Sequence, residues 1–224
     1  MRSFFLFLSS ALVAFTIAAP YPAIRLATRD VGFRAELGTK IADIVKIAQE
    51  SRKVPLGSFP PTAGASSSVQ IVGDWLNLKG VSAFYFFADM DVDCDGVAGC
   101  SDDVSGQAQT SFGHLDATQV PYFVLPAEFT AAHGDIVEPN AIGAIVCNGG
   151  AIPEVIGEAS LLLAQTCFPN DGLNANNGHT ASDVLYIVFG TTVAPGVGDQ
   201  TIDIPGLKAS GDKLVFTLQE ALGL

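Results

Sequence analysis

The sequence has few basic residues: 11 Lys and Arg stand against 23 Asp and Glu, which gives a formal net charge of −12 at pH 7. This shortage argues against a nucleic-acid-binding protein, because phosphates are neutralised by Lys and Arg. An acidic surface attracts cations and raises their local concentration. We therefore expect either a cationic ligand or a surface whose acidity serves solubility, with no nucleic-acid partner.

Long apolar runs are also scarce, and the clearest one is at the N-terminus. Arg2 precedes the apolar segment 4–17, and the small residues Ala18 and Ala19 follow it. This arrangement predicts a secretory signal over residues 1–19, and its apolar part is too short for a confident membrane span. We therefore expect a secreted, extracellular protein with no membrane anchor.

The remaining chain is long enough for one domain with its own core. We expect a short propeptide or N-terminal extension over residues 20–34 and a single, monomeric domain over residues 35–224. Apolar residues at helical spacing predict an amphipathic helix in 35–52. Residues 55–68 are rich in Pro, Gly and Ser and predict a surface loop.

Short apolar runs separated by Gly, Pro and Asn predict a series of strands. They lie at residues 69–72, 81–88, 120–125, 141–146, 184–189 and 213–218. The last of these could instead begin a terminal helix, and Leu161–Ala164 can form a short helix. Because strands dominate and do not alternate with helices, a barrel or sandwich is favoured over an alternating α/β sheet.

Cysteine is rare, with four in the chain. In a secreted protein, four cysteines predict two disulfides, with three pairings open. Proximity in the sequence favours Cys94 with Cys100 and Cys147 with Cys167. The spacings do not match a zinc module.

Aspartates alternate in one acidic segment, and their pattern resembles the start of a calcium-binding loop. Asp91, Asp93 and Asp95 are followed by Gly96, with Asp102 near the position where such a loop closes. The segment before them reads as a strand, whereas such loops follow a helix. Two other interpretations stay open: Asp91 and Asp93 bind amines in a cleft, or the segment is an acidic surface loop closed by a disulfide.

The stretch 141–170 joins a predicted strand, a glycine turn and two acidic residues, Glu154 and Glu158. A carboxyl group beside Gly157 and a buried strand is where a glycosidase places its general acid, because low polarity raises the pKa of a carboxyl group. The alternative is that Glu158 begins a helix, where the helix dipole favours an acid. No pattern indicates a serine triad, a phosphate loop or a cofactor site, so we expect no cofactor.

Six short motifs occur in order along the chain. They are Asp89–Gly96, Asp103–Gln107 with Thr110 and Phe112, Leu115–Ala117 with Pro121 and Tyr122, Val146–Gly149, Gly157–Ser160, and Gly178–His179 with Asp183–Leu185. Together they resemble the fungal endo-chitosanases of glycoside hydrolase family 75. The resemblance implies a secreted glycoside hydrolase that cleaves chitosan, a β-1,4-linked glucosamine polymer, with inversion at the anomeric carbon.

The resemblance also implies a mechanism with two carboxyl groups, roughly 6.5–9.5 Å apart. The family's general acid corresponds to Glu158. Its general base is an Asp in a Trp-Gly-Asp-Thr-Asn-Gly segment before that motif. This chain lacks the segment and has no Asp between positions 136 and 170.

Several explanations of the missing segment stay open. Glu154 could serve as a substitute base, or Asp91 or Asp93 could supply it. The protein could instead be a non-catalytic secreted protein of the same fold that binds chitosan or cell walls, or the segment could be lost through a gene-model error.

Three further positions have the chemistry to bond sugar hydroxyls, namely Gln107, Thr110 and His179. Each could instead satisfy backbone groups of the protein. The segment after Gly157 also resembles part of a double-psi β-barrel, a fold-level analogy. The expected fold is therefore mainly β, a β-barrel with double-psi likeness and two or three peripheral helices.

Overall fold

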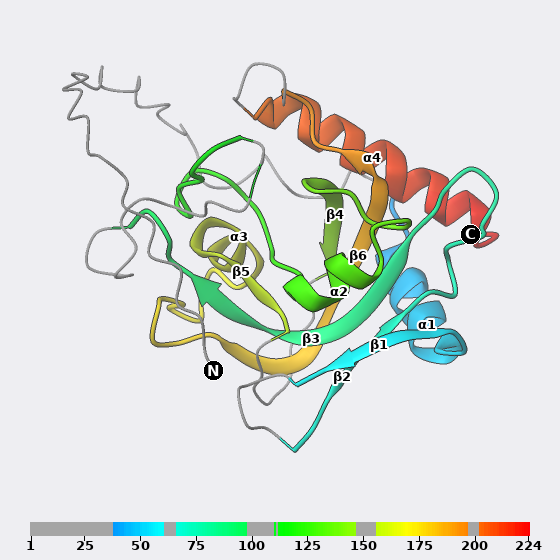
Figure 1. The fold of residues 1–224 in the computed structure, drawn as a ribbon, viewed down its shortest axis with the longest axis horizontal. Helices are drawn as coiled ribbons and strands as arrows, with labels where there is room; N and C mark the ends of the chain where they lie inside the picture. The colour runs from blue at the N-terminus through cyan, green and yellow to red at the C-terminus, as the bar shows by residue number, and fades with distance from the viewer. Residues whose placement is uncertain (1–37, 61–65, 98–109, 111, 147–155, 197–201) are drawn as a thin grey trace, which may run out of the picture.

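A computed structural model describes residues 38–60, 66–97, 110, 112–146, 156–196 and 202–224, and for 144–146 the backbone alone (Figure 1). The predicted signal at 1–19 and extension at 20–34 lie outside the described residues. The single domain expected over 35–224 stays a prediction.

A six-stranded sheet lies at the centre of the described structure. Its hydrogen-bonded order is β1 (Pro55–Phe59), β2 (Val69–Val72), β3 (Phe84–Asp93), β6 (His179–Val193) and β4 (Ala141–Val146), with β5 (Glu158–Ser160) paired to β3. Neighbouring strands run antiparallel, except that β5 runs parallel to β3. The parallel pair brings together segments far apart in the sequence.

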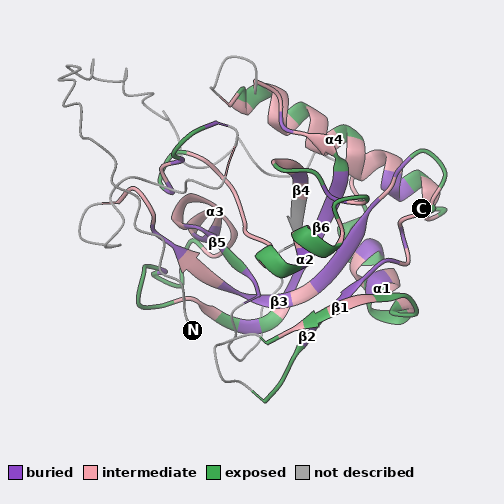
Figure 2. Ribbon diagram, viewed as in Figure 1, coloured by how far each residue is buried: buried purple, intermediate pink, exposed green. Residues whose placement is uncertain are grey.

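The long strands β3 and β6 are buried on both faces, as the purple positions along them in Figure 2 show. Side chains alternate between the two faces of a strand, so aromatic and branched residues fill two separate cores. One core contains Trp75, Tyr85, Leu185, Ile187 and Phe189. The other contains Phe84, Phe86, Val184, Tyr186 and Val188. The segments 84–88 of β3 and 184–189 of β6 are therefore apolar at every position.

Four helices cover these cores in the described chain. They are α1 (Ile41–Ser51), α2 (Ala127–Ala132), α3 (Leu161–Cys167) and α4 (Ile204–Ala221). Ile44 of α1 and Leu218 of α4 belong to the first core. Phe129 of α2 and Ala164 of α3 belong to the second. The structure thus confirms a mainly β fold with peripheral helices, two of which are short. None of the described helices is long and apolar enough to span a membrane.

Two of the strand and loop predictions are wrong. Residues 55–59 form β1 instead of a loop, because their backbone pairs with β2. Residues 120–125 make only an isolated bridge, between Phe123 and Ala159. Pro121 has no N–H to donate, which hinders a regular strand there. Residues 213–218 lie in α4, which confirms the helical alternative.

Other predictions agree with the structure. Residues 69–72 and 141–146 form strands, and α1 falls within the predicted helix at 35–52. The strand predicted at 81–88 instead spans Phe84–Asp93. Asp91 and Asp93 therefore lie on a strand. Closure into a barrel and the double-psi likeness stay predictions, since β1 and β4 are the outer strands in the pairing order of the described residues.

Candidate functional site

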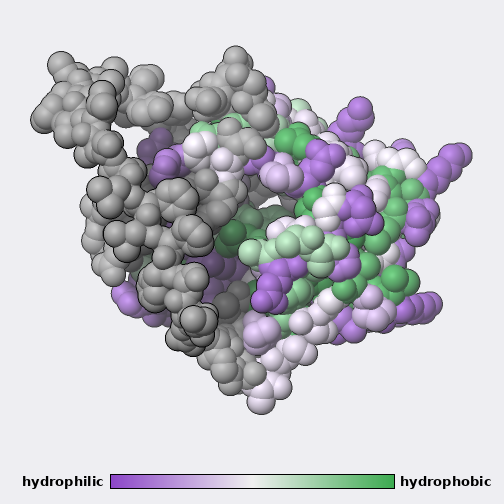
Figure 3. Space-filling view, viewed as in Figure 1, coloured by the Kyte–Doolittle hydropathy of each residue, from purple (hydrophilic) through white to green (hydrophobic). Residues whose placement is uncertain are grey.

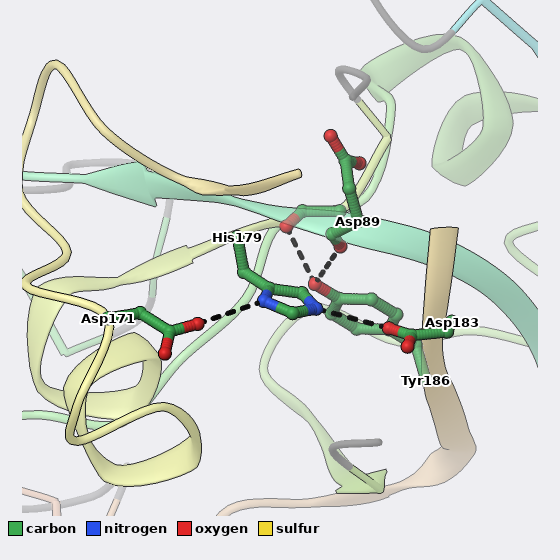
Figure 4. A network of polar contacts seen from close by, with 6 residues as sticks. Asp89, Asp171, His179, Asp183 and Tyr186 are labelled. Carbon is green, nitrogen blue, oxygen red and sulfur yellow. Dashed lines mark hydrogen bonds and ion pairs between the residues drawn. The ribbon is translucent and has the colours of Figure 1, made fainter. Parts of the chain in front are cut away.

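Gly157 brings the short strand β5 against β3. Its φ of +140° is strained for residues with a side chain, and an added Cβ atom would lie 2.4 Å from the carbonyl oxygen of Asp89. The hydroxyl group of Tyr186 lies 2.7 Å from the carbonyl oxygens of both Asp89 and Gly157 (Figure 4). One buried phenol thus links β3 to the residue that precedes Glu158.

The parallel pairing then sets the position of Glu158. Asp91 is opposite Glu158, and Asp93 is opposite Ser160. Residues directly opposite each other in a sheet point to the same face, as do residues two apart on one strand. Asp91, Asp93 and Glu158 therefore share a face of the sheet.

A third segment, residues 122–124, lies on the other side of β5. The Ser160 N–H donates to the Tyr122 carbonyl oxygen at 2.9 Å, and the Val124 N–H donates to the Glu158 carbonyl oxygen at 3.0 Å. The Ser160 hydroxyl accepts hydrogen bonds from the N–H groups of Tyr122 at 3.2 Å and Leu163 at 3.3 Å. Ser160 therefore caps α3 and holds Tyr122 beside the acidic residues.

Glu158 has a carboxyl group suited to proton donation. Its pKa is raised from 4.5 to about 7, first because protein atoms displace water and then because three aspartates repel its negative form; these are Asp93, Asp91 and Asp95. The residue keeps access to solvent, so the desolvation is partial. Burial also raises the pKa of Asp91 above its ordinary value.

Tyr122 lies among the same charges. Its pKa is raised far above the ordinary value, first by burial and then by the negative charge of Asp93, with smaller contributions from Asp95 and Glu158. The hydroxyl oxygen is buried and forms no hydrogen bond of good geometry. It is nevertheless close enough to Asp93 for that carboxylate to act on it as a hydrogen-bond acceptor would. The phenol therefore stays protonated at any pH relevant to the protein.

The face that carries Glu158 and Tyr122 opens on a cavity of about 1460 Å³. Its apolar lining includes Phe123, Ile142 and Val215. Figure 3 shows the molecule hollowed near its centre, with apolar surface in the hollow. Small-molecule pockets typically measure about 300–1,000 Å³, so this cavity has room for a ligand longer than one sugar.

His179 contacts three side chains of the protein. Its Nδ1 lies 3.3 Å from Asp171 and its Nε2 lies 3.1 Å from Asp183 (Figure 4). The imidazole stacks on Phe168 at 3.6 Å between ring centroids. These contacts agree with the structural alternative for His179, and its sugar-binding role stays a prediction.

Thr110 also bonds within the protein. Its hydroxyl donates to the Gly113 carbonyl oxygen at 2.8 Å and accepts from the Phe112 N–H at 3.1 Å, which closes a turn. Gln107 and Glu154 lie outside the described residues. The sugar-binding role of Thr110 and the base role of Glu154 stay predictions.

The predicted calcium ligands do not lie in one loop. Asp91 and Asp93 lie on β3, Asp95 follows it, and Asp102 lies outside the described residues. Within the described ranges, no group of three or more His, Cys, Asp or Glu residues is arranged to hold a metal ion. The Asp93 carboxylate accepts the Asp95 N–H at 2.8 Å, as in a tight turn.

Neither of the two described cysteines, Cys94 and Cys167, is a free thiol. Cys100 and Cys147 lie outside the described residues, so the predicted pairing stays a prediction.

Sequence reasoning missed Tyr122 as a site residue and Tyr186 as the anchor of β5. Tyr122 was present in a motif, after Pro121, but a tyrosine beside a proline carries no chemical signal by itself. Tyr186 looked like one more apolar residue of a buried strand. Both roles depend on contacts between distant segments.

Comparison with known proteins identifies the family. The model for the fungal chitosanases of glycosyl hydrolase group 75 matches residues 90–215. The chain is 39% identical over 209 residues to endo-chitosanase C of Aspergillus oryzae, covering 86% of this chain and 55% of that protein. It is 33% identical over 194 residues to an endo-chitosanase of Aspergillus fumigatus, covering 70% of this chain and 80% of that protein. The chain thus spans about half the length of the first relative, and it belongs to the fungal chitosanase family of glycosyl hydrolase group 75.

Proposed function

We propose that this protein is a secreted endo-hydrolase of chitosan, with its catalytic domain within residues 35–224 and Glu158 as general acid. The observation that carries the proposal is the placement of Glu158: it lies on the edge of a large cavity, beside three aspartates, with a pKa raised to about 7. A carboxyl group in this state is protonated in mildly acidic solution and can protonate a leaving oxygen. Relatives named endo-chitosanase support the substrate.

The acidic face suits a cationic polymer. Each glucosamine unit of chitosan carries an amino group that is protonated in acid, and Asp91 and Asp93 lie beside Glu158 to attract it. We propose that Asp91, which is partly exposed, binds an ammonium group and thereby places a glycosidic oxygen near Glu158.

The water-activating carboxylate is the second part of the proposal, and Asp91 and Asp93 are the described candidates. Strands lie about 4.8 Å apart and alternate residues about 6.6 Å apart, so the Glu158 backbone is about 5 Å from that of Asp91 and about 8 Å from that of Asp93. These are backbone separations, whereas the ranges of about 5 Å for retaining and 6.5–9.5 Å for inverting glycosidases apply between carboxyl groups. We propose Asp93 as the base, because it lies two residues along β3 from the position opposite Glu158 and so leaves room for a water molecule between the two residues.

The central test is the Glu158→Gln variant, assayed by release of reducing ends from chitosan. Loss of a general acid lowers kcat by about 10²–10⁴-fold. The matched control is Glu50→Gln, which removes an exposed glutamate of α1 and should keep full activity. Hydrolysis that survives in Glu158→Gln would refute the assignment of the acid. Wild-type protein that binds chitosan without cleaving it would support the non-catalytic alternative.

The anomer released first tests the base. Proton NMR of the fresh product should show the α-anomer from the β-linked polymer, and Asp93→Asn should abolish its release. Asp91→Asn should mainly raise KM. A β-anomer as first product would contradict the assignment to Asp93 and would favour Asp91.

A further inference from the structure

Tyr122 lies across β5 from Asp93. Ser160 separates them: Asp93 is opposite it on β3, and Tyr122 is opposite it on the other side. Ser160 is fully buried, and its small side chain is turned to backbone N–H groups. The long tyrosine side chain therefore extends over a small neighbour, and its hydroxyl reaches the vicinity of Asp93.

The hydroxyl group of Tyr122 is a hydrogen-bond donor that stays protonated. The side chains around it are mainly carboxyl groups, which accept hydrogen bonds when ionised. Its oxygen is buried, so a polymer in the cavity would not contact it directly. Any effect of the hydroxyl group on a bound polymer must therefore act through the neighbouring carboxyl groups.

The charged groups around Glu158 and Asp93 come from β3, β5 and the start of β6. Asp91 and Asp93 of β3 and Asp95 after it act on Glu158 of β5. Just before β6, Gly178 packs against Asp91, and His179, the first residue of β6, is held by two other aspartates. Among the described residues near Asp93, Tyr122 thus supplies a donor without a charge.

We propose that Tyr122 is a positioning residue whose hydroxyl faces Asp93 and keeps the negative charge on that carboxylate, so that the proton shared by the acidic residues resides on Glu158. Carboxyl groups this close titrate as a coupled set, and a donor beside one of them favours its ionised form. Asp93 has the largest charge effect on Glu158, so its ionisation matters most. The inference deepens the proposed function, on which it rests for the role of Glu158.

The test is the Tyr122→Phe variant, followed by carbon NMR of labelled glutamate carboxyl groups during a pH titration. The signal of Glu158 is assigned by its loss in Glu158→Gln. Without the hydroxyl, Asp93 takes up part of the shared proton, so Glu158 should titrate at a lower pH, by about half a pH unit or more. An unchanged midpoint would overturn the proposal.

Two further variants separate the mechanism from a general effect of losing a phenol. Tyr85→Phe removes another buried hydroxyl on β3, six residues and about 20 Å from Asp91, and should leave the midpoint unchanged. Asp93→Asn keeps the oxygen that accepts the Asp95 N–H but removes the charge. If Tyr122 acts through Asp93, Tyr122→Phe has no further effect in that background. A shift of equal size there would contradict the proposal.

The NMR result does not depend on catalysis, so it decides the inference even if the protein does not cleave chitosan. If chitosan is cleaved, Tyr122→Phe should move the alkaline limb of the kcat profile to lower pH and change KM by less than about twofold. Full hydrolysis with an unmoved Glu158 midpoint would refute the role of Tyr122 and leave the proposed function intact.

Discussion

Glu158 lies where two effects act together on a carboxyl group. Protein atoms displace part of its hydration, and like charges from one neighbouring strand and the turn after it oppose its ionisation. Both effects favour the neutral form, because the charged form loses solvation and gains repulsion.

This arrangement predicts a pH-dependent stability cost. The pKa of Glu158 is raised from its ordinary value of 4.5 to about 7 in the folded protein, so the folded state binds the proton more tightly. The contribution of Glu158 to stability is therefore most favourable at low pH and is lost as the pH rises from 4.5 through about 7. We expect Glu158→Gln to melt at the same temperature as wild type near about pH 4 and at a higher temperature near about pH 8. Equal melting temperatures at both values would contradict this prediction, and Glu50→Gln is the control.

Gly157 gives a prediction about packing. Gly157→Ala should lower the free energy of unfolding by about 2–4 kcal/mol, because the new methyl group meets the Asp89 backbone at a strained φ. The control is Gly211→Ala in α4, which meets open space and should raise stability by about 1 kcal/mol through better helix propensity. Chemical denaturation measures both, and similar effects of the two changes would refute the argument.

Among secondary-structure elements, β5 joins most of the site in three residues. It pairs with β3 on one side, contacts residues 122–124 on the other, and leads directly into α3. Ser160 terminates the strand and begins the helix. The sequence interpretation of Glu158 as the first residue of a helix was wrong, because the helix begins at Leu161.

Ser160→Ala should therefore weaken two elements at once. It removes the N-cap of α3 and the acceptor of the Tyr122 N–H, and we expect a loss of about 1–3 kcal/mol in unfolding free energy. Thr217→Ala, whose hydroxyl bonds within α4, should cost less than about 0.5 kcal/mol. A Ser160→Ala protein as stable as the Thr217→Ala control would contradict the dual role.

The sequence predicted those elements whose pattern is local. The branched runs of β2 and β4 and the helical spacing of α1 were read correctly. The strand at 55–59 was missed, because it depends on pairing with β2 and not on its own composition. Glu158 as candidate acid, with Asp91 or Asp93 as a possible base, came from motifs in the sequence. The register that places them came from the structure, since nothing in the local sequence indicates that β3 and Tyr122 lie on either side of β5.

On the scale of the whole molecule, charge and cavity act together. The net charge of −12 produces an attractive field for cations, and Glu158, which lines the cavity, lies beside three aspartates. Salt screens such fields: the Debye length shortens from about 10 Å at 0.1 M to about 3 Å at 1 M.

Under the proposed function, binding of chitosan should therefore weaken as the salt concentration rises. Raising the ionic strength from about 0.05 M to 0.5 M should raise KM for chitosan several-fold and change kcat little, because the long-range field is screened more than contacts at close range. Steady-state kinetics with short glucosamine oligomers, which carry fewer charges, should show a smaller change. A salt-independent KM would contradict a role for the overall charge.

The parallel pairing of β5 with β3 has a consequence for how the protein folds. Asp91 and Glu158 lie opposite each other in the sheet, yet the chain between them includes β4 and α2. Contacts between distant segments form late, after the intervening chain has lost its freedom. During refolding, the elevated proton affinity at position 158 should appear only when the native topology has formed. It would therefore report the final stage of folding, whereas helix content can rise earlier.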